Sequence, residues 1–350
     1  MNITLKTRRA LYGEPIFAAC EAPDGVCGAA AADGRIFPAQ NTRGGVIIIA
    51  SLPAESETEL TLSCRPAGSA AQIVTHGTSL DIMLGGKRFS SYVWDERFAK
   101  PYFGAVMTES GDSFTRLDFE TPEHPHHRSV FLGVGDVTLA GSDAKNVDFW
   151  NEPENRGVQR QRSVGGFEAG QAFARFRAEN VWRSASGIAM LDESRTFTVY
   201  NQSAGCRYVD IDFTFTASYG EVVFGATKEA GPLGIRVNDA LRADRGGHMT
   251  NSYGASGESE CWGRPAHWCD YSGTLGGREA GITVFDNPQN ERYPTTWHIR
   301  DYGLFAANNL YFRGGLTIAQ GNELNYRYRI IFREGKMENI TDRFINYIGG

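Results

Sequence analysis

A run of eight residues in which apolar and polar side chains alternate strictly constrains the fold more than any other feature. Residues 209–216 read Val-Asp-Ile-Asp-Phe-Thr-Phe-Thr. Successive side chains of a β-strand point to opposite faces, so this run predicts a strand with one face on a core. Residues 196–200 and 326–332 repeat the pattern. Long alternating strands of this kind predict a large antiparallel β-sandwich.

Composition agrees with an all-β fold. The 350 residues include 41 glycines and are 12% aromatic, which is typical of strands joined by tight turns rather than of helical bundles. One segment has helical spacing, with Ile340, Phe344 and Ile348 four residues apart. It predicts a capping helix over residues 338–348.

Turn signals divide the chain into two expected units. Residues 1–68 alternate short apolar stretches with turns and predict a small β-sandwich-like segment, in which residues 46–50 form a buried strand. Residues 69–350 would form the large sandwich, starting with a hairpin at Gly85 and Gly86. Because the first unit contains no histidine, we expect the second to carry the site.

Charge and termini limit the classes of partner. The formal charge is −6, with cations scattered along the chain, so neither nucleic acid nor an anionic membrane is an expected partner. No apolar stretch approaches the roughly 20 residues that cross a bilayer, and the N-terminus resembles no secretory leader, which predicts a cytoplasmic protein. The Gly-rich stretches match no phosphate-binding fingerprint, so no organic cofactor is predicted. Homo-oligomerisation stays open.

A histidine-rich run is the strongest candidate for chemistry. His124, His126, His127 and Arg128 surround Pro125, and three of the seven histidines fall within four positions. Imidazole suits proton transfer near neutral pH, and Arg128 would hold an oxyanion or a carboxylate. Pro125 predicts an extended or turned backbone, and in an extended one His126 and His127 would point to opposite faces. A polar loop and a divalent-metal site are the alternatives, although the spacing matches no specific metal signature.

A second dense run lies about 170 residues later, at Trp297, His298, Arg300 and Asp301. In a strand, His298 and Arg300 would share one face with Tyr302, while Trp297 shares the other with Asp301. Such groups are costly to bury singly. We therefore expect the two runs to meet on one concave face, with side chains within about 15 Å of each other.

Two further clusters supply candidates. Asp148, Trp150 and Asn151 combine an acid, an aromatic ring and an amide, as sugar-binding sites do. An ordinary turn with Trp150 in the core is the alternative. Glu229 follows an apolar strand in a Gly-flanked stretch and is a candidate catalytic carboxylate. The alternative is a surface pair with Lys228.

These stretches resemble a bacterial family labelled methane oxygenase PmoA-like, an all-β domain family of unknown function. The matching pieces are residues 100–103, 124–128 with Gly135 and Asp136, 148–151, 270–273, and 297–304 with Asn308. One departure is Ser129 followed by Phe131 and Leu132, where members more often have Gly and a Trp-rich stretch. The resemblance implies a scaffold similar to the galactose-mutarotase-like supersandwich, a role in carbohydrate catabolism, and substrate-binding positions at Asp136 and Asn308.

Together these features predict an enzyme of sugar catabolism that uses His and Glu acid–base chemistry, as an epimerase, lyase or hydrolase. His126 or His127, His298 and Glu229 would act as acid and base. The expected substrate-binding residues are His124, Arg128, Asp136, Asp148, Trp150, Asn151, Trp297, Arg300, Asp301 and Asn308. A non-catalytic sugar-binding protein and a metal-dependent oxygenase are the rival hypotheses.

Overall fold

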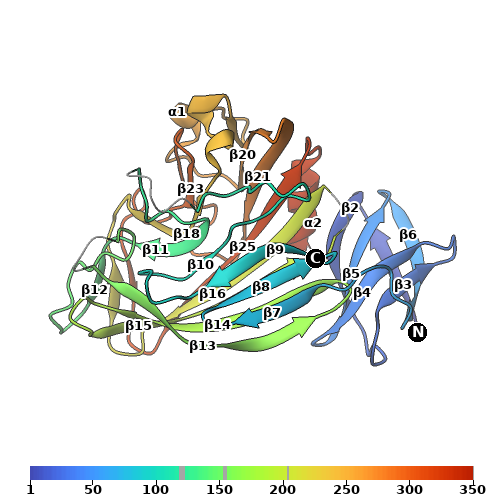
Figure 1. Ribbon diagram of the computed structural model, residues 1–350, viewed down its shortest axis with the longest axis horizontal. Helices are drawn as coiled ribbons and strands as arrows, with labels where there is room; N and C mark the ends of the chain where they lie inside the picture. Colours follow the sequence, from blue (N-terminus) through green and yellow to red (C-terminus); the bar gives the residue numbers. More distant parts are fainter. Residues whose placement is uncertain (118–122, 153–155, 203–204, 350) are drawn as a thin grey trace.

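Antiparallel strands make up most of the computed structural model, which describes residues 1–117, 123–152, 156–202 and 205–349. The strands form four sheets. In Figure 1 the first sheet, in blue, lies at one end of the molecule, and the later strands extend away from it. The all-β, antiparallel sandwich predicted from the alternating runs is confirmed.

The first sheet is built entirely from the first 63 residues. Its strand order is β1-β6-β3-β4-β5-β2. Strand β4 pairs with both β3 and β5, so the six strands are continuous. A separate apolar cluster, which includes Val46, Ile48 and Leu60, fills it. The division of the chain at residue 68 stays a prediction. The strands are β1 (Asn2–Thr7), β2 (Leu11–Ala19), β3 (Gly28–Ala31), β4 (Ile36–Thr42), β5 (Gly45–Leu52) and β6 (Ser56–Ser63).

A seam joins this sheet to the rest of the protein. Ile47 and Ile49, on the second face of β5, are buried in a cluster with Phe173, Tyr208 and Phe344. Phe344 belongs to α2 (Ile340–Gly349), the C-terminal helix expected from the sequence. In Figure 1 this helix lies beside β2, between the first sheet and the other strands.

Two eight-stranded sheets form the sandwich. The first, which we call the site sheet, has the order β22-β23-β18-β11-β10-β9-β8-β7, and the second has the order β13-β14-β15-β16-β25-β21-β20-β19. Strand β25, the last in sequence, therefore lies inside the second sheet, between β16 and β21. The site-sheet strands are β7 (Gln72–His76), β8 (Ser79–Leu84), β9 (Lys87–Val93), β10 (Tyr102–Phe103), β11 (Val130–Val134), β18 (Ala230–Arg236), β22 (Trp297–Ile299) and β23 (Leu304–Ala307).

The second sheet contains all three alternating runs of the sequence. Its strands are β13 (Val158–Ala169), β14 (Phe173–Arg183), β15 (Ala189–Tyr200), β16 (Cys206–Thr216), β19 (His248–Asn251), β20 (Trp268–Leu275), β21 (Arg278–Asp286) and β25 (Glu323–Glu334). The remaining elements are a small sheet of β12 (Val137–Leu139), β17 (Val222–Phe224) and β24 (Leu316–Ile318), a short helix α1 (Glu258–Cys261), and the 3-10 turns η1 (Asp239–Leu241) and η2 (Ala243–Arg245). None of the helices in the described ranges is long and apolar enough to span a bilayer.

Aromatic side chains fill the space between the two sheets. Tyr92 of the site sheet lies 5.2 Å from Phe176 of the second sheet, and Phe103 stacks on Phe197 at 4.8 Å between ring centroids. Such rings bury a large apolar area each and prefer tilted or offset contacts. They belong to the main core cluster.

A row of five residues crosses the opposite face of the site sheet. His298 lies opposite Ala306, Ala306 opposite Gly234, Gly234 opposite Phe131, and Phe131 opposite Tyr102. Directly opposed residues of antiparallel strands share a face. We call this the outer face, because the alternate residues of these strands point into the main core: Phe103, Val130, Leu233, Ile235, Trp297, Ile299, Phe305 and Ala307.

Candidate functional site

The histidine run forms a tight turn that leads into β11. The backbone N–H of His127 donates to the carbonyl of His124 at 3.1 Å, with Pro125 at the second position of the turn, where its fixed φ is favoured. His124 itself has a φ of 50°. Of the two backbone forms expected here, extended and turned, the structure has the turn. His126 and His127 do not point to opposite faces, and their ring centroids lie 4.3 Å apart.

Four rings stack in a column over the outer face. Tyr302 stacks on His124 at 4.6 Å, His124 on His127 at 5.0 Å, and His127 on Phe131 at 5.7 Å, with interplanar angles of 2°, 5° and 13°. Trp150 meets His127 edge-on at 5.3 Å. We call Tyr302, His124, His127 and Phe131 the ring column.

The ring column brings the two sequence runs together. The guanidinium carbon of Arg300 lies 5.6 Å from the centroid of Tyr302, whose ring stacks on His124. His298, on the same face, lies edge-on to Trp262 at 6.4 Å. Segments that are about 170 residues apart in sequence therefore form one cluster, within the expected 15 Å for Arg300 and His124.

Burial keeps the imidazoles of this cluster neutral. It lowers the pKa of His126 to about 3 and that of His298 to about 4, and it holds the pKa of His127 well below 6.5. Neighbouring positive charges, Lys100 for His126 and Arg300 for His298, act in the same direction. Charged groups lose solvation on burial, so the neutral imidazole is favoured.

Several of these ring nitrogens have no hydrogen-bond partner among the described residues. They are both nitrogens of His127, both of His298, Nε2 of His126 and Nδ1 of His124. The Lys228 carbonyl is near enough to His298 to favour the charged form of the imidazole. The two groups do not, however, have the geometry of a normal hydrogen bond. Buried polar atoms are usually paired. This concentration of unpartnered ring nitrogens makes the cluster the candidate site.

A buried ion-pair group lies beside the ring column. Lys100 is 2% exposed and donates to the Trp150 carbonyl at 2.7 Å and to Glu152 Oε1 at 2.8 Å. Arg128 binds the other oxygen of the same carboxylate. Arg128 was expected to hold an oxyanion or a carboxylate, and the structure places it on the carboxylate of Glu152. The sequence did not indicate Lys100 and Glu152 as parts of the site. A lysine is rarely buried unless it is paired, and the partner of Lys100 lies 52 residues away in sequence.

Three predicted substrate-binding residues stabilise turns. Asp148 accepts from the backbone N–H groups of Trp150 and Asn151 and from the Asn151 side chain, at 2.8 to 3.0 Å. Asp136 accepts from Asn146 at 2.9 Å. Asn308 donates to the carbonyls of residues 227 and 228 and accepts from the N–H groups of residues 310 and 311. These contacts fix the backbone around the outer face.

The second run divides between the two faces of the site sheet. Trp297 points into the main core and donates its indole N–H to the Ala266 carbonyl at 2.9 Å, so it does not reach the outer face with His298. Arg300 pairs with Glu258 at 2.9 Å, and Asp301 is exposed. Glu229 is 38% exposed in its side chain and lies 3.7 Å from Lys228. This is the arrangement of a surface pair.

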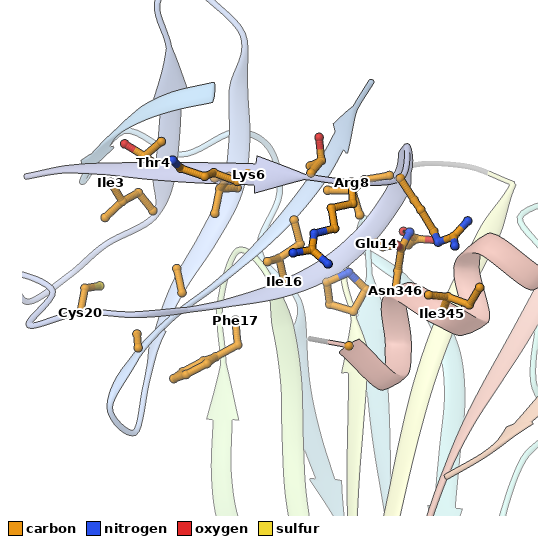
Figure 2. Close-up of a pocket in the computed structure, with 18 of the residues that line it drawn as sticks. Ile3, Thr4, Lys6, Arg8, Glu14, Ile16, Phe17, Cys20, Ile345 and Asn346 are labelled. Carbon is orange, nitrogen blue, oxygen red and sulfur yellow. The ribbon is translucent and has the colours of Figure 1, made fainter. Parts of the chain in front are cut away.

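A groove of about 1110 Å³ lies elsewhere, between the edge strands β1 and β2 of the first sheet and the end of α2. Figure 2 shows Lys6, Arg8 and Glu14 along it, with Asn346 beside Glu14. Its lining contains no histidine. The outer face is therefore the candidate site, because the groove lacks a comparable set of proton-transfer groups.

No three His, Cys, Asp or Glu side chains in the described ranges are grouped as ligands of one metal ion. The six cysteines are free thiols.

Residues 79–342 match the model of a family of unknown function, DUF6807. The chain belongs to this family. The resemblance to a PmoA-like family was wrong, since the matching model is that of DUF6807. The DUF6807 match begins with the first residue of β8 and ends within α2, so it contains every candidate site residue.

Comparison with solved structures gives weak similarity to carbohydrate-active enzymes. A GH36 α-galactosidase from Geobacillus stearothermophilus has a TM-score of 0.38 at 11% identity, over 76% of this chain and 41% of that one. A galactose 1-epimerase from Lactobacillus acidophilus has a TM-score of 0.33 at 8% identity, over 76% and 99%. A heparan sulfate lyase from Pedobacter heparinus has 0.32 at 9%, over 91% and 38%. This chain thus spans about two fifths of the α-galactosidase. No curated protein matches the sequence.

Proposed function

We propose that this protein is an enzyme that acts on a sugar or sugar derivative by acid–base chemistry, as an epimerase, lyase or hydrolase. The set of buried, neutral imidazoles with unpartnered ring nitrogens on the outer face carries the proposal. A neutral imidazole accepts a proton at one nitrogen and donates one at the other. Sugar hydroxyls, which both donate and accept, are suitable partners for such atoms.

His298 is the proposed general base. It lies in β22, where the ladder with β23 holds its backbone, and its pKa of about 4 keeps it unprotonated at neutral pH. Negative charge that develops on a bound substrate would raise this pKa and so favour proton transfer. His126, whose Nε2 is also unpartnered, is the proposed partner in proton transfer.

The test is turnover of a panel of monosaccharides and keto-sugars, followed by NMR of the products. His298→Gln should lower turnover by on the order of a hundredfold or more, because Gln is close to His in size but is no base. His248→Gln, at an exposed position of β19, is the matched control and should keep full activity. Exhaustive chelation should also leave the rate unchanged.

Two other results have defined meanings. Sugar binding without consumption of any sugar would assign the protein to the non-catalytic binding class. Stoichiometric bound metal, with activity lost to a chelator and restored by one ion, would move His124, His126 or His127 and His298 into ligand roles.

A further inference from the structure

Two buried arginines beside the ring column have unused hydrogen-bond donors. Arg236, in β18, is 0% exposed, and Arg116 is 5% exposed. Nε and Nη1 of both side chains lack a hydrogen-bond partner in the described part of the chain. Nη1 of Arg116 lies 3.6 Å from an Asp239 oxygen, and the other three nitrogens have no such neighbour among the residues that the structure describes. Leaving a buried charged donor unpaired is costly, so these nitrogens indicate a site for an anionic group.

Both guanidinium groups are close to the proposed chemistry. Arg236 lies two residues beyond Gly234 on the outer face, and its guanidinium carbon is 5.0 Å from the centroid of Tyr302 in the ring column. Arg116 is next to it, because its backbone N–H donates to the Arg236 carbonyl at 3.0 Å. Burial and the adjacent Arg116 lower the pKa of Arg236 to about 10, as expected for like charges that lack full compensation.

The carboxylates that pair with the arginines here are all partly exposed. Arg116, Arg236, Arg242 and Arg245 pair only with Glu123, Asp239 and Asp244 among the described residues, and these three side chains are 32 to 41% exposed. Solvent screens such pairs, so the buried guanidinium groups lack full compensation, which a ligand carboxylate would supply.

We propose that Arg116 and Arg236 bind the carboxylate of a sugar acid, which makes uronates and related sugar acids the substrate class of the outer face. This inference rests on the acid–base function proposed above. A planar guanidinium matches the two oxygens of a carboxylate. The carboxylate at Arg236 would lie next to the Tyr302 ring, with the sugar ring directed toward the imidazoles.

Glu123 occupies part of this position in the isolated protein. Its carboxylate is 39% exposed and accepts from Arg242 at 3.0 Å, but from Arg236 at a longer 3.4 Å. A ligand carboxylate would therefore displace Glu123 from Arg236, while Arg242 keeps its bond. Removing the charge of Glu123 should strengthen the binding of an acid.

The experiment compares matched sugars by titration calorimetry on the full chain: D-glucuronate against D-glucose, and D-galacturonate against D-galactose. Each acid should bind at least about tenfold more tightly than its neutral partner, with a preference that declines as salt rises. Glucose 6-sulfate and glucose 6-phosphate test whether another oxyanion serves equally well.

Variants assign the effect to the two arginines. Arg236→Gln and Arg116→Gln should each abolish the preference for acids, with folding checked by circular dichroism. Arg245→Gln is the control, since this member of the network is exposed (55%) and its charge is screened by solvent. Glu123→Gln should tighten acid binding severalfold. It keeps the proposal testable if the buried variants do not fold.

The outcomes separate this inference from the proposed function. Equal affinity for acids and neutral sugars overturns the carboxylate site, even if neutral sugars are turned over. Sulfate or phosphate esters that bind as tightly as the acids overturn the assignment to a carboxylate. Preferential binding of acids with no turnover of any sugar supports the site and overturns the enzyme. Failure to bind any sugar overturns both.

Discussion

Histidines that stay neutral when folded make the protein sensitive to acid. Burial lowers the pKa of His298 from 6.5 to about 4, so the unfolded chain binds a proton between these pH values that the folded chain does not. Stability falls as pH falls wherever the unfolded state binds more protons. The stability that His298 contributes therefore starts to decline as pH falls below about 6.5 and is lost near pH 4. It returns as pH rises again.

The His298→Gln variant tests this linkage. In the wild type, His298 alone should reduce the free energy of unfolding by on the order of 3 kcal/mol between pH 7 and pH 4. Urea unfolding at pH 7, 6 and 5 should show a shallower decline in the variant, because glutamine does not titrate. His248→Gln should retain the wild-type slope. If His298→Gln also shows the wild-type dependence of stability on pH, His298 is not held neutral in the folded protein.

At the level of single residues, sequence could find the histidines but not the charges that surround them. Three histidines within four positions, and His298 in an alternating run, were visible in the chain. The burial of Lys100 and Arg236 depends on Glu152 and Glu123, which are 52 and 113 residues away. Nothing in the local pattern encodes such pairs.

Individual strands were the most predictable elements. Alternation located β16 and β25, the Gly pair located the β8–β9 turn, and helical spacing located α2. Alternation also placed His298 and Trp297 on opposite faces, although the core role of Trp297 could not be seen without its partner strands. Around Pro125 the sequence left an extended and a turned backbone open, since the choice depends on a positive φ at His124, which few residues other than Gly adopt.

The row across the outer face depends on a small residue at its centre. A Cβ atom on Gly234 would lie 2.7 Å from the ring of Phe131, the base of the ring column. Overpacking of this kind forces neighbouring side chains out of their preferred positions. Glycine at this position therefore allows Phe131 to lie flat under His127.

Gly234→Ala should lower the free energy of unfolding by about 1–3 kcal/mol and reduce sugar turnover, because the displaced ring carries His127 with it. Gly165→Ala, at a strand position with open space around the added carbon, should change stability by less than about 1 kcal/mol. Chemical denaturation and turnover measured on both variants check this. Unchanged activity in Gly234→Ala would mean that the column is not needed for the site.

At the scale of the whole molecule, the first sheet supports the sandwich without supplying a candidate site residue. Its contribution is the seam of Ile47 and Ile49 with Phe173 and Phe344. Gln40 strengthens the seam, since its side-chain oxygen accepts from the backbone N–H groups of residues 172 and 173 at 3.2 and 3.1 Å. We expect the two parts to unfold together.

The double variant Ile47→Ala and Ile49→Ala should uncouple them. Each truncation removes a buried side chain, at a cost of about 2–5 kcal/mol, so calorimetry should show two transitions in place of one, while sugar affinity is retained. Phe17→Ala, at an exposed position of the same sheet, should keep a single transition. Loss of sugar binding in the double variant would show that the first sheet shapes the site.

The position of β25 has a consequence for biosynthesis. This strand is made last among the 25, yet it joins β16 to β21 in the interior of the second sheet. During translation the two halves of that sheet therefore leave the ribosome without the strand that connects them. The edge of β16 stays unpaired until β25 is made, more than 100 residues later. Domains with such non-local pairing fold slowly. We therefore expect the nascent chain to depend on chaperones that protect unpaired strand edges.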